Sequence, residues 1–138
     1  MALPVMSPLV SERIWALPVS APAVKFLLYL VFRSETNGAL PSQREMAREY
    51  KVSPTTVSTL LSPLFELNIV LRPQGEKREG NSYRLHPLAA AYDSIDAMHQ
   101  AFQQAVKDMG NGDLPVLNLP EYQSAPPAEG RPELRIAS

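Results

Sequence analysis

Cysteine is absent from this chain, and its absence excludes several kinds of site. Without thiols there is no disulfide framework, no thiolate zinc site and no cysteine nucleophile. Histidine is also scarce, with two among 138 residues, and no Ser/His/Asp spacing or paired-carboxylate motif accompanies them. We therefore expect a protein that is not an enzyme and that holds neither a metal ion nor a cofactor.

Long apolar runs and a large net charge are missing as well. The longest apolar run, Phe26–Phe32, is far shorter than the roughly 20 residues that span a bilayer. The opening MALPVMSPLV lacks the basic start and long apolar stretch of a secretory signal. These features predict a soluble, cytoplasmic protein without a membrane partner. A formal charge of −1 argues against non-specific coating of nucleic acid.

Charge is unevenly distributed along the sequence. Residues 42–84 contain seven basic and five acidic side chains, whereas residues 85–138 contain three basic and seven acidic ones. The length suits one domain with a single core and appendages. Any contact with a polyanion is therefore expected from the middle of the chain.

The segment PSQREMAREYKVSPTTVSTLLSPLFELNIVL, residues 41–71, contains two helix starts and a tight turn. Ser42 lies three residues before Glu45, the spacing of a capping box. Ser53 followed by Pro54 indicates a second N-cap with proline at the first helical position. Lys51 lies in the turn between them.

The second of these helices is predicted to be amphipathic. Thr and Ser occupy one side, while the apolar residues of the other side recur at helical spacing, namely Val57, Leu60, Leu61, Leu64 and Leu67. A hydroxyl-bearing face of this kind suits the major groove of DNA. Pro63 predicts a bend in the helix, or a stop at Ser62 followed by a restart.

Through PSQREMA and SPTTV, residues 39–75 resemble the winged helix-turn-helix domain of GntR-type regulators and the helix-turn-helix domains of bacterial plasmid replication proteins. The resemblance implies a mostly α fold with a small β-hairpin, namely a winged helix-turn-helix, here with an N-terminal extension and a long C-terminal helix. It also implies binding to double-stranded DNA and a role in transcription regulation. Proteins of this family commonly have glycine at the turn position of Lys51, so we expect some strain or a slightly different turn there. Too few residues follow Arg84 for the large effector domain usual in GntR-type proteins, so we expect no small-molecule effector.

Residues 69–74 and 82–86 are predicted to pair as strands, with GEKREGN between them as the wing. Lys77 and Arg78 at its tip could reach a phosphate backbone or a minor groove. The same residues are also typical of a solvent-exposed loop without a binding role. The residues expected to bind DNA are Ser42, Arg44, Arg48, Lys51, Ser53, Thr55, Thr56, Ser58, Thr59, Arg72, Lys77, Arg78 and Arg84.

The region before this motif is predicted to supply the core. Ser20 caps a helix that runs to about Arg33, and its body is apolar enough to be covered all round. Upstream, LVSERIW forms a short amphipathic piece that would dock on the domain or on a second copy. Trp15 within it is expected to be a core plug.

After Pro87 the sequence predicts one uninterrupted helix to Met109. Its apolar residues follow a heptad spacing, which suits packing on its own domain or, as we favour, on a second copy. His99 is expected to be a partly buried structural residue, and Asp96 with His99 lacks a third ligand for a metal site. The proposed dimerisation residues are Leu88, Tyr92, Ile95, His99, Phe102, Val106 and Met109.

These patterns divide the chain into an N-terminal arm (1–19), a winged helix-turn-helix domain (20–86), a dimerisation helix (87–109) and a flexible, Pro-rich tail (110–138). The apolar residues Leu114, Val116, Leu117, Leu119 and Tyr122 in the tail could lie in a groove. The leading hypothesis is a homodimeric, nucleoid-associated transcriptional regulator, a repressor, that binds double-stranded DNA sequence-specifically. One alternative is a plasmid replication or partition protein. Another is a protein-protein interaction module, because residues 53–67 contain no Lys or Arg.

Overall fold

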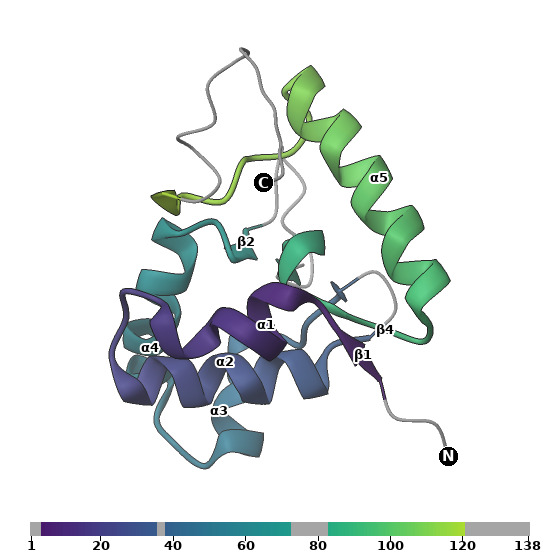
Figure 1. The fold of residues 1–138 in the computed structure, drawn as a ribbon. Coiled ribbons are helices and arrows are strands. Elements are labelled where there is room, and N and C mark those ends of the chain that lie inside the picture. Colours follow the sequence, from purple (N-terminus) through teal and green to yellow (C-terminus); the bar gives the residue numbers. More distant parts are fainter. Residues whose placement is uncertain (1–3, 36–37, 73–82, 121–138) are drawn as a thin grey trace.

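The computed structural model describes residues 4–35, 38–72 and 83–120. Five α-helices and two small antiparallel sheets occupy these ranges, an arrangement compatible with a helix-turn-helix-like fold (Figure 1). The elements are β1 (Val5–Met6), α1 (Pro8–Arg13), the 3-10 turn η1 (Ile14–Ala16), α2 (Ala21–Arg33), α3 (Gln43–Tyr50), α4 (Pro54–Glu66), β2 (Val70–Leu71), β3 (Arg84–Leu85), the 3-10 turn η3 (Pro87–Ala89), β4 (Ala91–Tyr92) and α5 (Ile95–Asn111).

Helix α2 forms the centre of the core. The hydroxyl of Ser20 accepts a hydrogen bond from the amide of Ala23 and so caps the helix, as predicted. Phe26, Leu27 and Leu30 are fully buried. The expectation that the helix is covered all round is wrong, because the Phe32 side chain is 63% exposed near its C-terminal end.

Helix α4 is continuous from Pro54 to Glu66. The alternative of a stop at Ser62 is therefore wrong, and Pro63 is accommodated inside the helix. Proline lacks the amide that would bond to the carbonyl of Thr59, so one helical hydrogen bond is absent at this point. Asn68 follows with a φ of 64°, a left-handed conformation that asparagine tolerates.

The N-terminal segment packs on the domain. Strand β1 pairs with β4, joining Val5 to Tyr92 and Met6 to Ala91, and Leu9 and Val10 of α1 are buried in the core. Trp15 is not a core plug, since its side chain is 79% exposed and its indole N–H donates to the carbonyl of Glu12. The apolar face of α1 is completed by Leu9 and Val10 without it.

The predicted helix from Pro87 to Met109 is wrong in its first two turns. Pro87 begins the short turn η3, and Ala90 then adopts an extended conformation with a ψ of 177°. Tyr92 belongs to β4, whose pairing with β1 competes successfully with helix formation. Ser94 provides the real N-cap, because its hydroxyl accepts from the amide of Ala97, and α5 starts at Ile95.

Strands β2 and β3 pair antiparallel, with Val70 opposite Leu85 and Leu71 opposite Arg84. Ala39 adds an isolated bridge to Arg84, next to Gly38, whose φ is +76°. A Cβ at Gly38 would lie 3.0 Å from the carbonyl oxygen of Leu85, so only glycine fits this approach. The predicted wing tip, residues 73–82, lies outside the described residues.

Residues after α5 return across the domain rather than leaving it at Gly110. Leu117 and Leu119 are buried, and the amide of Asn118 donates to the carbonyl of Leu67 at 2.9 Å. The chain therefore packs on the domain beyond residue 110, where the flexible tail was predicted to start. Of the apolar residues expected to lie in a groove, Leu117 and Leu119 belong to the core, whereas Val116 is 36% exposed. Residues 121–138 lie outside the described residues.

His86 fastens this returning segment to the core. Its Nδ1 accepts the amide of Leu88 at 3.1 Å, so Nε2 carries the proton and donates to the carbonyl of Pro115 at 2.7 Å. The ring is completely buried. Burial lowers the pKa of His86 below its usual value and keeps the ring neutral.

Candidate nucleic-acid interface

Helix α3 carries its exposed cations on one flank. Ser42 caps it by accepting from the amide of Glu45, and Met46 and Ala47 fix its orientation by packing into the core. Arg44 and Arg48 lie one turn apart on α3, Lys51 follows directly after the helix, and all three side chains are exposed. This basic stripe comprises Arg44, Arg48 and Lys51.

The acidic flank of α3 is held against α2 instead. Glu49 accepts hydrogen bonds from Arg33 at 2.8 Å and from the Tyr29 hydroxyl at 2.7 Å. These bonds, first that from Arg33, lower the pKa of the Glu49 carboxyl, while burial and the neighbouring carboxylate raise the pKa of Tyr29. Glu49 is thus neutralised by its partners and stabilises the placement of α3. Glu45 interacts with Arg48 at a longer distance of 3.4 Å.

The turn between α3 and α4 joins the basic stripe to the start of α4. Lys51 has φ 63° and ψ 48°, the left-handed conformation, and its amide donates to the carbonyl of Ala47. Ser53 then caps α4 by accepting from the amide of Thr56 at 3.1 Å. The exposed Lys51 therefore lies two residues before Ser53, the N-cap of α4.

Helix α4 leaves its hydroxyl face exposed. Val57, Leu61 and Leu64 are completely buried, so the opposite side of the helix is turned to solvent. The exposed hydroxyl residues on that side, referred to below as the hydroxyl face, are Thr55, Thr56, Ser58, Thr59 and Ser62.

The hydroxyls of this face are not equivalent. Thr56 shares a hydrogen bond with Ser53 at 3.0 Å, and Thr59 donates to the carbonyl of Thr55 at 3.1 Å. Within the described part of the chain, the hydroxyls of Thr55 and Ser58 have no hydrogen-bond partner. Among the described residues the Ser62 hydroxyl also has no partner, but it lies in the C-terminal half of α4. Thr55 and Ser58 are therefore the hydroxyls of the N-terminal half with both donor and acceptor free for a ligand.

Glu66 is the charged residue of α4 and lies exposed at its C-terminal end. Its carboxylate would repel a phosphate chain at that end of the helix. The geometry therefore favours an approach of a polyanion to the N-terminal half of α4, next to Lys51.

Three residues that the sequence analysis did not select support this surface. The Phe65 ring lies 5.8 Å from the Tyr83 ring, and the Tyr83 hydroxyl accepts from the side-chain amide of Gln43 at 3.2 Å. Arg72 places its guanidinium 4.2 Å from the centre of the Phe65 ring. These contacts fasten the start of α3, the end of α4 and the strands to one another. In the sequence, the only signal for these contacts is the presence of aromatic residues at positions that turn out to be half-buried.

The other cations predicted to bind DNA do not all lie on this surface. Arg84 lines a recess of about 230 Å³ with Tyr92, Gln104 and Asp108, on the side of β3 that faces α5. Arg84 is therefore separated from the hydroxyl face. Lys77 and Arg78 lie outside the described residues, so their placement stays a prediction.

The predicted dimerisation residues do not form a single seam. Leu88 is buried in the core and Tyr92 lies in β4, so neither belongs to α5. Phe102 and Met109 are half-buried against the domain, whereas Ile95, His99 and Val106 are exposed. His99 is thus not the partly buried residue that was expected. In the described ranges no group of three His, Cys, Asp or Glu side chains could hold a metal ion.

The sequence matches no known protein family and no curated protein. Among solved structures, a "possible transcriptional regulator" from Methanosarcina mazei Go1 is similar, with a TM-score of 0.38 and 15% identity. That similarity covers 75% of this chain and 78% of the other. A likeness this loose assigns neither a family nor an activity. Within the described residues, no helix is long and apolar enough to cross a membrane.

Proposed function

We propose that this protein binds double-stranded DNA sequence-specifically and regulates transcription as a homodimeric repressor in the nucleoid. In this proposal the N-terminal half of α4 enters the major groove. Thr55 and Ser58 contact base edges there, and the basic stripe of α3 contacts the adjacent phosphates.

The single observation that supports the proposal best is the exposed start of α4. There two unpartnered hydroxyls lie on a helix whose other side is buried, directly after the exposed cation of Lys51. Helices that read DNA present the residues of their N-terminal part to base edges in this manner. Phosphate contacts by Arg and Lys then fix the register of the helix on the duplex.

Because this surface combines hydroxyls with cations, it also predicts how the binding free energy divides between contacts to base edges and contacts to phosphates. Hydroxyls discriminate bases weakly, because Ser and Thr can both donate and accept. Most of the binding free energy must then come from the cations, and binding should weaken steeply as salt rises. Two copies on one site would raise both affinity and selectivity.

Selection of bound duplexes from a random pool, followed by sequencing, tests the proposal directly. The Thr55→Ala/Ser58→Ala variant should lose preference for the selected sequence while keeping its affinity for random duplex. The Arg44→Ala/Arg48→Ala variant should weaken binding to both duplexes and reduce the slope of log affinity against log salt by roughly two.

Lys25→Ala provides the matched control, because it removes an exposed lysine from α2 rather than from the α3–α4 surface. Its salt slope and sequence preference should equal those of the unchanged protein. Equal losses in Lys25→Ala and in the stripe variant would contradict the assigned interface. Repression is tested by placing the selected sequence across a promoter in a reporter assay, where expression should fall.

A protein-interaction role is the second candidate, and exposed aromatic side chains favour it. Trp15 and Phe32 are both largely exposed, and α4 contains no cation. Large exposed aromatic side chains are enriched at protein interfaces. Failure to bind any duplex at low salt would favour this role over DNA binding.

A further inference from the structure

Helix α5 presents an apolar stripe to solvent on a side that its own domain does not cover. The Ile95 and Val106 side chains are 57% and 62% exposed, and His99 lies exposed between them. We call Ile95, His99 and Val106 the outer stripe. The side of α5 that packs on the domain is a different one and carries Met98 and Ala105, both buried.

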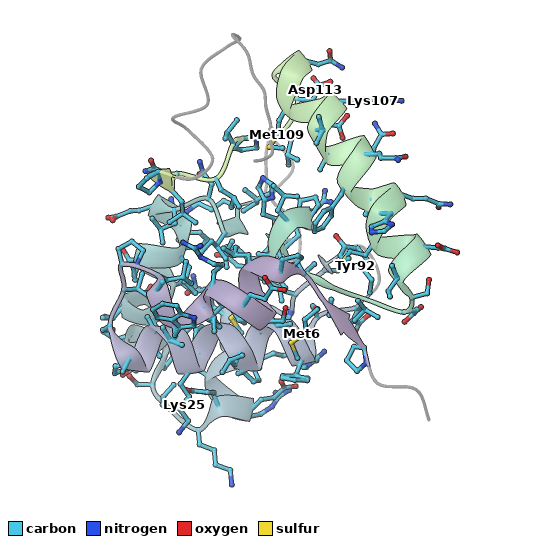
Figure 2. All side chains as sticks on the ribbon, in the orientation of Figure 1. Met6, Lys25, Tyr92, Lys107, Met109 and Asp113 are labelled. Carbon is cyan, nitrogen blue, oxygen red and sulfur yellow. The ribbon has the colours of Figure 1, made fainter. Side chains whose placement is uncertain are left out.

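Charges flank the outer stripe in a self-complementary pattern. Asp96 and Lys107 are both exposed, and each follows directly after one of the two apolar residues of the stripe. The same spacing of about three turns therefore separates Ile95 from Val106 and Asp96 from Lys107. Lys107 projects away from the body of the domain, whereas Met109 lies on the side that faces it (Figure 2).

We propose that the outer stripe is the contact between two copies of this chain, with the two α5 helices antiparallel about a twofold axis near the middle of the helix. In that arrangement Ile95 packs on the partner subunit's Val106, and Asp96 pairs with the partner subunit's Lys107. The twofold axis repeats both contacts, so each copy offers the same patch to the other. His99 lies close to the axis, beside the half-buried Phe102.

The positions of the two charges select the antiparallel orientation. Asp96 and Lys107 lie on the same flank of α5, and equivalent flanks meet only when paired helices run in opposite directions. A parallel pair would instead set Ile95 against Ile95 of the partner subunit. It would also separate Asp96 from the partner subunit's Lys107 by about 16 Å along the axis, at 1.5 Å per residue.

The pairing leaves the candidate DNA surface free, because α4 and α5 lie on opposite sides of the domain (Figure 1). It rests on the proposed function only for the role of the dimer, which is to place two α4 helices on one duplex. Pairing and DNA binding are measured separately, so either can fail while the other stands.

Sedimentation equilibrium of the full chain without DNA should reveal a concentration-dependent dimer. Val106→Asp should raise the dimer dissociation constant at least roughly tenfold, because it buries an unpaired charge at the contact. Phe32→Asp is the matched control, since it adds the same charge at an equally exposed apolar side chain on α2, and it should leave the constant unchanged. Circular dichroism checks that both variants keep their helix content.

A charge swap tests the orientation. Asp96→Lys and Lys107→Asp should each weaken the dimer roughly threefold to tenfold by opposing like charges, and the double variant should return to within about twofold of the unchanged chain. Only the antiparallel register predicts that rescue. Because the chain has no cysteine, Ile95→Cys/Val106→Cys should form a disulfide-linked dimer on oxidation, while Ile95→Cys alone should not. A monomer at every concentration up to about 1 mM, or efficient cross-linking by Ile95→Cys alone, would overturn the proposal.

Discussion

Replacing Lys51 by glycine should separate the stability of the domain from its binding to DNA. Lys51 has a φ of 63° at the C-terminal end of α3, and its side chain is exposed with no ion pair among the described residues. A residue with a Cβ loses about 1–2 kcal/mol in this left-handed conformation, whereas glycine does not. Glycine also makes the unfolded chain more flexible, which costs about 0.4–1 kcal/mol.

The net expectation for Lys51→Gly is a gain of about 0.5–1 kcal/mol in the free energy of unfolding, or a rise of about 3 °C in melting temperature. Urea denaturation followed by circular dichroism measures the gain. In gel shifts the same variant should bind all duplexes more weakly, with a salt slope reduced by roughly one, because one cation of the stripe is lost.

Asn68→Gly is the matched control, since Asn68 has nearly the same φ of 64°. Asparagine tolerates this conformation, and the Asn68 side chain donates to the carbonyl of Val116 at 2.9 Å. Glycine at this position should therefore destabilise the domain by about 1 kcal/mol. A loss of stability in Lys51→Gly would refute the strain argument, and unchanged DNA binding would remove Lys51 from the proposed interface.

Three further changes test the core and the helices. The pKa of His86 is lowered in the folded state, so the unfolded chain takes up the proton first as pH falls. The contribution of His86 to the free energy of unfolding should therefore be fully present above about pH 6.5 and should decline below that pH. His86→Gln should flatten this decline in urea titrations between about pH 5 and 8. Pro63→Ala restores an amide donor inside α4 and should stabilise the domain by about 1–3 kcal/mol in thermal unfolding, whereas a lower melting temperature would indicate that the helix is adapted to proline. Trp15→Ala should change stability by less than about 0.5 kcal/mol, while Leu27→Ala should cost about 3 kcal/mol, and a large loss in the tryptophan variant would contradict its exposed position.

Short-range signals in the sequence were sufficient for the first turns of three helices. Ser20, Ser42 and Ser53 each cap a helix through the side-chain hydrogen bond that a serine in that position predicts. A cap depends on residues within one turn, so the surrounding fold changes it little. The left-handed conformation of Lys51 agrees with an expectation of a different origin, namely the glycine that the resembling family commonly has at this turn.

Signals that depend on distant parts of the chain were misread. Pro87 is typical of a helix start, but β4 pairs with β1, which lies about 85 residues earlier, and this pairing delays the helix to Ile95. The heptad spacing also could not distinguish the packed side of α5 from its exposed side. Ala105 and the flexible Met98 contact the domain, while the β-branched Ile95 and Val106 remain exposed.

The candidate DNA surface combines both kinds of information. Sequence periodicity placed the hydroxyls of α4 on one side, and burial of Val57 and Leu61 turns that side to solvent. The sequence could not indicate that Thr56 bonds to the N-cap Ser53 and Thr59 to the carbonyl of Thr55, leaving Thr55 and Ser58 as the free hydroxyls in the N-terminal half of α4. Nor could it show that Glu49 is held by α2.

That contact between α2 and α3 links the core of the protein to its candidate site. Arg33 and Tyr29 of α2 hold the Glu49 carboxylate by hydrogen bonds. Because its pKa is lowered, the Glu49 carboxylate is ionised near neutral pH and retains the hydrogen bonds from Arg33 and Tyr29. Helix α3, with two cations and two carboxylates, and Lys51 after it can therefore present a locally positive surface although the chain as a whole has a charge of −1. The orientation of α3, more than its composition, would determine how strongly this surface attracts DNA.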